Sequence, residues 1–562
     1  MSSNFDSRSR HLSPPSVMGI RSRLRQGSYG RLFRTLPPWG SDIPDAAVLD
    51  RSIKSLAQIL TAPEEDLPEE HTVLPAGYTY LGALITHDMT FDSATLRQRE
   101  IDPDRLHNFR TPALDLDCIY GRGPLDQPYL YQRENFAKFL IGEGLSGLEP
   151  DLPRIGTTAV IGDPRNDETI LLSQLHLALL RFHNEIVDWL VPTQQSSALS
   201  QEPVSDTSVA FRWNLFATAQ QLVRWHYQWI LIYDFLERIL DPEVYQRLLK
   251  VVEGHSSSRD PDLRFFRPTN DPYIPLEFSG AAFRFGHSMS RPAYRLNRSL
   301  QNSYRDQVLE QTDGLIPIFA DRDDPRNRLA MNKPGAFANR GELLDLSGGR
   351  KLPIGWQVDW REFFDSDLSY PYQRSMRINS RFAAELNQMP NENGSRLAAE
   401  GVPLLPYLDL QKGVVLQLPS GQALAAAMRL PKIYTNEELG IAPEIGCREA
   451  PLYFYILKES EIQFRGLRLG RLGSEIVGEV IVGMILFDSG SFASVNPAWK
   501  PTLGPRSGEF RMADLLSFTA ADFAPERTDD PAADNMAENI KVLKMASQVS
   551  AKKSELPSHC RR

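Results

Sequence analysis

Apolar residues recur at helical spacing over long stretches of this chain, whereas the alternation typical of strands is sparse and local. Residues 168–190, ETILLSQLHLALLRFHNEIVDWL, are apolar on a wide face and open with a carboxylate, which favours a helix N-terminus. Residues 211–240 predict a second long helix that stops at Asp241 and Pro242, and the polar segment 192–208 joins the two. The pattern predicts a mainly α fold: one large domain with little β-structure and a functional site between helices.

Both ends of the chain differ in composition from this body. Residues 1–40 hold seven arginines against one acid and predict a basic flexible arm. Such an arm could make weak contact with an anionic surface, although a solvated tail is the reading that its composition favours. Residues 526–562 predict a charged C-terminal tail in which 536–549 could form one surface helix. The folded domain is therefore expected at 41–525.

Composition and charge narrow the class of protein. The chain has 562 residues, 41% apolar and 24% charged, as an ordinary globular protein does. Its net charge of −9 argues against nucleic acid as a partner. Three cysteines are too few for a disulfide framework or a zinc site. No apolar run predicts a transmembrane segment, and no secretory signal pattern is present, so we expect a cytoplasmic protein or one secreted by a non-Sec route.

Two of the ten histidines stand out from the rest. His176 and His183 lie seven residues apart on the predicted 168–190 helix, too far for one metal, and are expected to pack in the core. His87, in GALITHDMTFD, is followed by carboxylates, and His287, in FRFGHSMSRP, is flanked by arginine and glycine. From these residues alone, each can be either a packed core histidine or a functional one.

The heptad TPALDLD, residues 111–117, predicts a cation site. In an extended segment Thr111, Asp115 and Asp117 would point the same way, and the carbonyl of Ala113 could point with them. Converging carboxylate, hydroxyl and carbonyl oxygens suit a calcium ion. An exposed strand edge fits the heptad equally well, and a third carboxylate would decide between the two. Asp88 is the candidate.

Five segments, in order, resemble the animal heme peroxidases of the peroxidase–cyclooxygenase superfamily, in one of its bacterial branches. GALITHDMTF is similar to the distal-histidine helix and TPALDLDCIYG to the calcium loop. GDPRNDETILLSQLHLALLRFHNEI is similar to the distal-arginine segment, FRFGHSMSRP to the proximal-histidine segment, and LDLQKGVVLQLPSG to the segment holding its hydrogen-bond partner. NPAWKPTL and MADLLSFT resemble the closing helices, so the resemblance spans roughly residues 40–525.

The resemblance implies a large single-domain fold with heme b between helices. His87 and Arg165 would be the catalytic distal pair that acts on hydrogen peroxide. His287 would be the axial ligand of the heme iron, and Arg284 would pair with a heme propionate. Asp409 falls where the family usually has an asparagine that accepts from the proximal ring, and a carboxylate there should lower the reduction potential.

The resemblance also implies a calcium ion held by Asp88, Thr111, the carbonyl of Ala113, Asp115 and Asp117. Since neighbouring helix residues point about 100° apart, His87 could face the heme while Asp88 faces the calcium.

Three positions determine whether halide oxidation and covalent heme attachment can be expected from the resemblance. Relatives that oxidise halides have a glutamine where this chain has Ala83, which puts halide oxidation in doubt. Many relatives attach the heme through two ester-forming acids. Thr86 replaces the first, and Glu168 matches the second, so at most one ester is expected.

The implied function is a peroxidase that reduces hydrogen peroxide through a ferryl intermediate and oxidises small phenolic-type one-electron donors. One alternative is an oxygenase like the fatty-acid dioxygenases of the superfamily. Those relatives carry a tyrosine three residues before the proximal histidine, where this chain has Arg284. The other alternative is a non-catalytic heme-binding or adhesion protein. The joint presence of His87, Arg165 and His287 argues against it.

Overall fold

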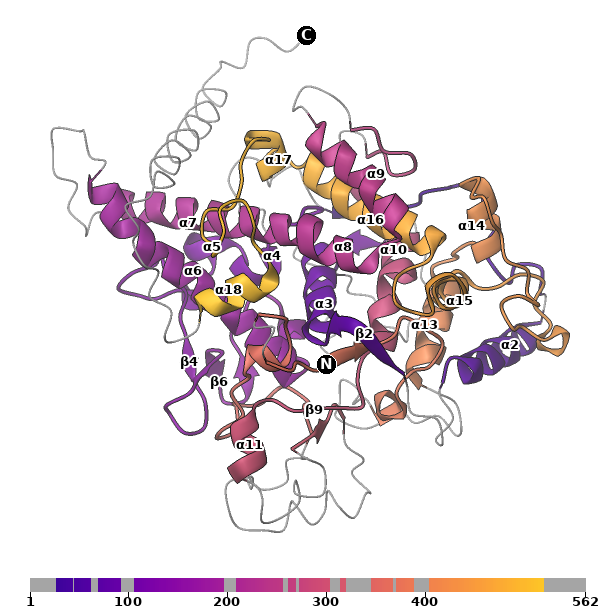
Figure 1. Cartoon of the computed structure of the whole chain (residues 1–562), viewed down its shortest axis with the longest axis horizontal. Coiled ribbons are helices and arrows are strands. Elements are labelled where there is room, and N and C mark those ends of the chain that lie inside the picture. Colours follow the sequence, from indigo (N-terminus) through magenta and orange to yellow (C-terminus); the bar gives the residue numbers. More distant parts are fainter. Residues whose placement is uncertain are drawn as a thin grey trace, which may run out of the picture.

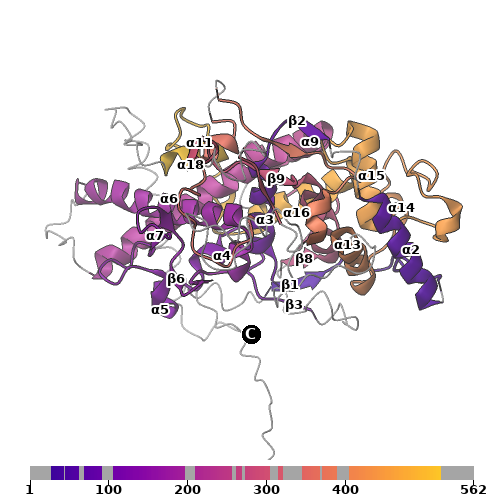
Figure 2. The same ribbon diagram turned by 90° about the horizontal axis from the view of Figure 1, so that it is seen from below.

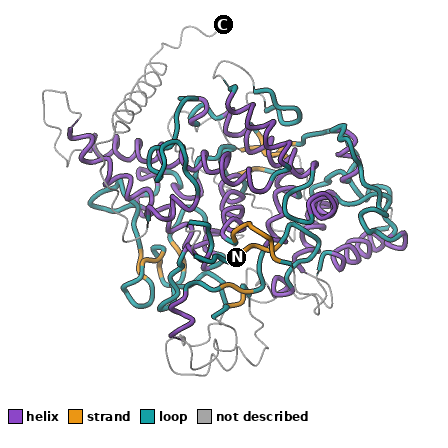
Figure 3. The backbone as a smooth tube through the Cα atoms, viewed as in Figure 1, coloured by secondary structure: helices purple, strands orange, loops and turns teal. Residues whose placement is uncertain are grey.

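Helices make up most of the chain in the computed structural model, and the few strands are short (Figure 3). The structure describes residues 27–43, 45–61, 69–91, 106–196, 209–255, 261–268, 272–303, 314–319, 345–366, 370–388 and 404–519. The prediction of a mainly α fold is confirmed. No helix of these ranges is both long and apolar enough to cross a lipid bilayer.

Long α-helices alternate along the chain with short 3-10 turns and short strands. The α-helices are α2 (Ala46–Ile59), α3 (Gly77–Met89), α4 (Asp117–Tyr120), α5 (Gly123–Asp126), α6 (Ile170–Ser196), α7 (Val209–Ile230), α8 (Leu236–Ile239), α9 (Pro242–Glu253), α10 (Leu276–Gly280), α11 (Arg298–Ser303), α13 (Leu404–Val415), α14 (Gly421–Ala427), α15 (Leu452–Phe464), α16 (Arg471–Phe487), α17 (Phe492–Val495) and α18 (Met512–Phe518). The 3-10 helices are η2 (Pro128–Leu130), η3 (Pro164–Asp167), η5 (Ala282–Met289), η7 (Trp360–Glu362), η8 (Ala384–Gln388) and η9 (Pro443–Ile445), and η4 (Leu231–Phe235) is a π-helical turn. The strands are β1 (Gly27–Gly30), β2 (Glu70–Pro75), β3 (His107–Asn108), β4 (Gly142–Glu143), β5 (Pro150–Asp151), β6 (Arg154–Ile155), β7 (Thr158–Ala159), β8 (Tyr273–Pro275), β9 (Ala293–Tyr294), β10 (Ile316–Pro317) and β11 (Arg374–Met376).

Helix α3 occupies the centre of the molecule. In the two views of Figures 1 and 2 it lies between the α6–α7 pair and the group formed by α13, α14 and α15. It packs against α4, α6, η3 and η5, which are far apart in the sequence. Because α3 is buried on nearly every side, its side chains define the core of the site described below.

The predicted helix 211–240 is interrupted near its end. Helix α7 stops at Ile230, the π-helical turn η4 follows, and α8 ends at Ile239. The carboxylate of Asp234, in the π turn, accepts hydrogen bonds from the Tyr78 hydroxyl at 2.7 Å and from the Met512 amide at 2.9 Å. The wider turn thus aims a buried carboxylate at α3 and α18, which a uniform helical period does not predict. Asp241 and Pro242 end this helix as predicted, and they also begin α9.

The prediction of a flexible arm over residues 1–40 is wrong for its last part. Residues 27–40 belong to the folded body: β1 pairs in parallel with β8 and antiparallel with β3, and the Trp39 amide donates to the carbonyl of Leu418 at 2.7 Å. These backbone bonds join segments that are far apart in the sequence, so composition alone cannot reveal them. The rest of the arm, residues 1–26, and the C-terminal tail with 536–549 lie outside the described residues.

Two further boundaries differ from the prediction. Helix α6 begins at Ile170, after Glu168, and runs to Ser196, so the start of the predicted 192–208 linker is helical. The MADLLSFT segment forms α18, but NPAWKPTL, residues 496–503, is irregular. Pro497 and Pro501 explain the difference, since proline removes the backbone donor that a helix interior needs.

Candidate functional site

One face of α3 is open although the rest of the helix is buried. Gly82, Ala83 and Thr86 are the residues of α3 that are not buried. Ala83 shares a helix face with His87, because it precedes it by four residues, and Thr86, three residues after Ala83, borders the same face. Small side chains next to a histidine therefore leave space beside its ring, as a flat cofactor would require.

The His87 ring is held from behind by an amide. Its Nδ1 lies 2.9 Å from Oδ1 of Asn166, in η3. Burial, together with the positive charge of Arg165, lowers the pKa of His87 to about 3. The ring is therefore neutral at ordinary pH, and its Nε2 can act as a base.

Arg165 is fixed beside the C-terminal end of α3. Its Nε and Nη2 donate to the carboxylate of Asp163 at 3.1 and 2.7 Å. Nη2 also donates to the carbonyls of Thr90 and His87 at 2.6 and 3.2 Å. The guanidinium lies 4.7 Å from the centre of the Phe91 ring. These bonds use one edge of the guanidinium and leave Nη1 for a ligand.

His287 occupies η5, on a different segment from the distal residues. Its Nδ1 lies 2.7 Å from Oδ2 of Asp409, which is on α13. Its side chain is 35% exposed, although Phe285, Ser288 and Met289 around it are buried. The Asp409 bond uses Nδ1, and no hydrogen bond joins Nε2 to another of the described residues, which is the arrangement that a metal ligand needs.

The Asp409 carboxylate has a second partner that the sequence did not predict. Nη1 of Arg284 donates to its Oδ1 at 2.8 Å. Burial acts to raise the pKa of Asp409, but the charges and hydrogen bonds of His287 and Arg284 outweigh it and hold the pKa below its usual value. Because the negative charge is shared with Arg284, the effect of Asp409 on His287 should be weaker than that of an unshared carboxylate. The predicted propionate contact of Arg284 stays a prediction.

The Glu168 carboxyl lies close enough to both Arg165 and His287 for their charges to affect its pKa. It is solvent-accessible yet closely surrounded by protein, and this desolvation raises its pKa to about 7 against the opposing charge of Arg165. The charge of His287 also acts on it. Thr86, at the other predicted attachment position, donates its hydroxyl to the carbonyl of Gly82 at 3.0 Å. A partly protonated carboxyl at Glu168 is suitable for an ester, and the engaged Thr86 hydroxyl is not.

A cluster of three carboxylates lies behind α3. Single oxygens of Asp88, Asp115 and Asp117 all lie within 4.8 Å of one another. Asp88 is fully buried, and neither of its oxygens accepts a hydrogen bond of regular geometry from the described residues. Burial and the two neighbouring carboxylates raise the pKa of Asp88, and burial raises that of Asp117 to about 7. Such a cluster requires either protons or a cation, and its donor set fits calcium.

The 111–117 segment reaches this arrangement by bending. The prediction of an extended segment is wrong, since residues 112–115 form a bend and Leu116 has a φ of 59° before α4 begins. The Thr111 hydroxyl donates to Asp115 at 2.8 Å, which a straight strand would not allow at this spacing. Ala113 is buried in the same bend, and its carbonyl as a ligand stays a prediction. A bend, rather than the alternation of an extended strand, thus brings the predicted residues together.

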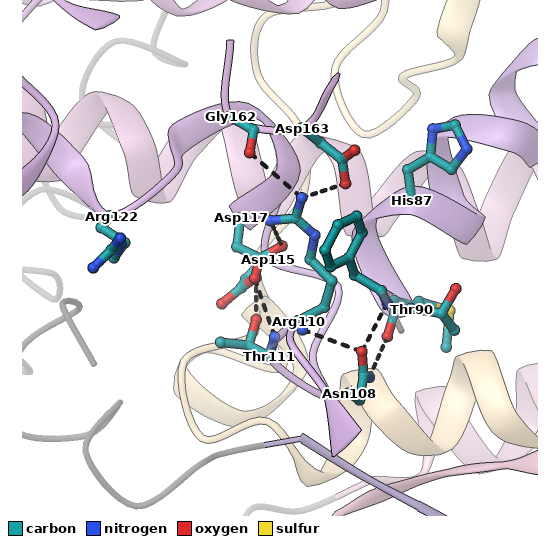
Figure 4. Close-up of polar contacts among 12 residues, drawn as sticks. His87, Thr90, Asn108, Arg110, Thr111, Asp115, Asp117, Arg122, Gly162 and Asp163 are labelled. Atoms are coloured by element: carbon teal, nitrogen blue, oxygen red, sulfur yellow. Dashed lines mark hydrogen bonds and ion pairs between the residues drawn. The ribbon is translucent and has the colours of Figure 1, made fainter. Parts of the chain in front are cut away.

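Arg110 links the carboxylate cluster to the distal arginine. Its Nη1 lies 3.5 Å from Oδ1 of Asp117, and its Nη2 donates to Asp163 (Figure 4). Asp163 also pairs with Arg165, at 2.7 Å. Figure 4 shows the His87 ring pointing away from this cluster. Sequence reasoning missed Arg110, Asp163 and Asn166, although each lies within two residues of a predicted site residue.

A family model described as "Animal haem peroxidase" matches residues 80–318, a range that includes all the predicted site residues except Asp409. Human thyroid peroxidase is 31% identical over 267 residues, covering 42% of this chain and 26% of that protein. Mouse thyroid peroxidase is 25% identical over 325 residues, covering 50% and 33%. A peroxidase-like protein of Margaritifera margaritifera is 32% identical over 199 residues, covering 34% and 22%. The matched region thus spans no more than about a third of these relatives.

Solved structures share the fold at low sequence identity. Peroxidase A from Dictyostelium discoideum has a TM-score of 0.50 and 13% identity, over 83% of this chain and 88% of that one. The Oryza sativa fatty acid alpha-dioxygenase has a TM-score of 0.53 and 14% identity, over 83% and 76%. Proteins named as a peroxidase and as a dioxygenase therefore have the same overall architecture as this chain.

Proposed function

We propose that this chain, a member of the animal heme peroxidase family, reduces hydrogen peroxide and oxidises small phenolic-type one-electron donors. One observation carries the proposal. A neutral His87 on α3, oriented by Asn166, lies beside Arg165 of η3, whose guanidinium is held by several hydrogen bonds. On other elements, Asp409 binds Nδ1 of His287 and leaves Nε2 for a metal. A base, a charge-stabilising donor and a metal ligand are the groups that peroxide cleavage requires.

Heme b is the proposed cofactor, and the residues present fit it. Small, incompletely buried side chains line the face of α3 beside His87, and Nε2 of His287 would be the ligand for the iron. When bound, heme b would supply the iron that binds peroxide and stores its oxidising equivalents. Asp409 would hold the His287 ring in one tautomer and orientation.

His87 and Arg165 carry out the proton transfer and the charge stabilisation. Nε2 of His87 takes the proton from the inner oxygen of peroxide and returns it to the outer oxygen as the bond breaks. Nη1 of Arg165 stabilises the charge on the leaving oxygen, an effect of about 2.7–4 kcal/mol by analogy with oxyanion-hole donors. Its other nitrogens are already bonded, so the guanidinium has little freedom to turn away.

Calcium is proposed as the ion that fixes this geometry. It would neutralise Asp88, Asp115 and Asp117 and so join α3 to the 111–117 bend. Arg110, which contacts Asp117 and Asp163, would then help to hold Asp163 and its partner Arg165 in place. The ion acts as a structural support rather than as a reactant.

An oxygenase is the second candidate. The likeness to a dioxygenase is one of fold alone, at 14% identity. At the position where the dioxygenases of the superfamily carry a tyrosine, Arg284 forms an ion pair with Asp409, and no tyrosine lies between Tyr273 and Tyr294. The peroxidase is therefore the better-supported proposal, and a fatty acid consumed with oxygen uptake in the absence of peroxide would favour the oxygenase.

Glu168 should form the single ester to heme, through a reaction that peroxide itself drives. Mass spectrometry of acid-denatured protein should show a heme-sized mass increase after peroxide treatment, and Glu168→Gln should abolish it. The raised pKa of Glu168 favours the reaction, since a carboxylic acid and not only a carboxylate is then present at neutral pH. Heme that always extracts cleanly from wild-type protein would show that Glu168 has no such role, and a mass shift that survives Glu168→Gln would place the link elsewhere.

Chloride and bromide should be poorer substrates than phenols. Ala83 lies on the open face of α3 and cannot position a halide as the glutamine of halide-oxidising relatives would. Steady-state rates at several pH values check this, with Ala83→Gln as the variant expected to raise bromide turnover. Wild-type bromide turnover equal to that of phenols would mean that another residue does the glutamine's work.

A further inference from the structure

Asn166 is bound on both sides by histidine rings. Its Oδ1 lies 2.9 Å from Nδ1 of His87, and its Nδ2 lies 3.0 Å from Nδ1 of His176, on α6. Asn166 and His176 are fully buried and His87 is nearly so. The three side chains form a line from the distal pocket into the core, and the reaction described above uses only the first of them.

The chemistry of an amide makes this line directional. An amide oxygen only accepts hydrogen bonds and an amide nitrogen only donates them. His87 must therefore carry its proton on Nδ1, which leaves the lone pair on Nε2, and His176 must have no proton on Nδ1. With the amide reversed, Asn166 would donate to His87, the proton would move to Nε2, and His87 could no longer act as a base. In the orientation that the structure shows, Nδ1 of His176 accepts from the amide nitrogen and so keeps the amide oxygen turned toward His87.

We propose that Asn166 and His176 are positioning residues that keep His87 in the tautomer able to take the peroxide proton. This inference rests on the proposed peroxidase function. His176 does not contact His87 through this chain of bonds. It orients the Asn166 amide, and the amide orients the His87 ring. Because an amide carries no charge, it stabilises the protonated ring less than a carboxylate would, so His87 can release the proton again.

Helix α6 provides a matched control for this role. His183, two turns further along, is also fully buried, and burial lowers its pKa to about 4, as it lowers that of His176 to about 3. His183 instead bonds the hydroxyl of Tyr120 at 3.1 Å and the carbonyl of Ala137 at 2.8 Å. Loss of either ring leaves a similar cavity and should cost similar stability, but only His176 is connected to His87.

The test compares His176→Leu, His176→Gln and His183→Leu in the heme-loaded protein. Stopped-flow absorbance gives the rate of the reaction with peroxide. We expect His176→Leu to slow it by about 10- to 100-fold, as loss of an outer hydrogen-bond partner does at metal sites. His176→Gln should restore most of the rate, since its amide oxygen can accept from Asn166. His183→Leu should lower the melting temperature but leave the rate nearly unchanged.

Proton placement is measured independently of turnover. In protein with isotope-labelled histidine, NMR of the cyanide complex should show an exchange-protected proton on Nδ1 of His87, and His176→Leu should lose that protection. If His176→Leu does not fold, Asn166→Leu, which removes the bridge itself, replaces it with the same expected result.

The outcomes separate this inference from the function on which it rests. Wild-type protein that takes up no heme or does not react with peroxide contradicts the proposed function. An active wild type whose His176→Leu variant keeps both its rate and its Nδ1 proton overturns the positioning role alone. Equal slowing by His183→Leu would also overturn it, since the effect would then be one of packing.

Discussion

Replacing His287 by alanine should remove stable heme binding, whereas replacing His87 by alanine should keep heme and slow the reaction with peroxide by about 10²–10⁴-fold. One ring offers a free nitrogen to the iron, and the other moves a proton. Heme absorbance per polypeptide measures the first effect and stopped-flow kinetics the second. Since the neutral ring is the reactive form and the pKa of His87 is about 3, the wild-type rate should be flat from about pH 8 to pH 5 and fall only in stronger acid.

The two variants control for each other, because each removes one histidine ring from the candidate site. Equal heme loss in both would mean that the sides have been assigned wrongly. A His87→Ala rate equal to that of the wild type would remove the acid–base role, whatever the heme content.

Loss of calcium should inactivate the protein without removing a heme contact. We expect one slowly exchanging calcium ion per chain, and Asp115→Ala should lose it and lower the peroxide rate by at least about 10-fold. Without the ion, Asp88 and Asp117 remain buried beside each other and α3 loses its attachment to the 111–117 bend. Metal analysis and heme content of the same samples check the two halves of this expectation. Asp126→Ala, an exposed acid in the nearby α5, is the control and should change neither.

The calcium-free protein should also show a characteristic dependence of stability on pH. Burial raises the pKa of Asp88 and of Asp117 above the ordinary value of an aspartate. A raised folded-state pKa stabilises the protein below the unfolded value and loses that contribution as pH rises through the folded value. The melting temperature of calcium-free protein should therefore fall as pH rises from about 4 to 7, and calcium should remove the trend. Active protein without bound calcium would contradict the site.

Residue spacing was sufficient to predict the orientation of α3. His87 and Asp88 are adjacent, and a helix places adjacent side chains about 100° apart, so one can face a cofactor and the other a cation. The apolar pattern likewise predicted α6 and α7, because their buried faces repeat at the helical period. These features depend on local geometry, which the sequence specifies directly.

Features that depend on distant partners were not predictable in the same way. The 111–117 segment was expected to be extended, but its bend is held from α7, where Arg224 donates to the carbonyl of Asp115 at 2.7 Å. The pairing of Arg284 with Asp409 joins residues 125 positions apart. Arg110 and Asp163 have no unusual sequence context, and their role in the site is visible only once the fold brings them together. Long-range contacts of this kind leave no periodic signal in a single sequence.

The absorption spectrum of the purified protein, before and after adding peroxide, tests most directly whether this chain is a heme-dependent peroxidase. We expect protein from heme-replete cells to show a Soret band that changes on addition of peroxide and recovers when a phenolic donor is supplied. Colourless protein from such cells, or a Soret band that peroxide does not change, would contradict the account.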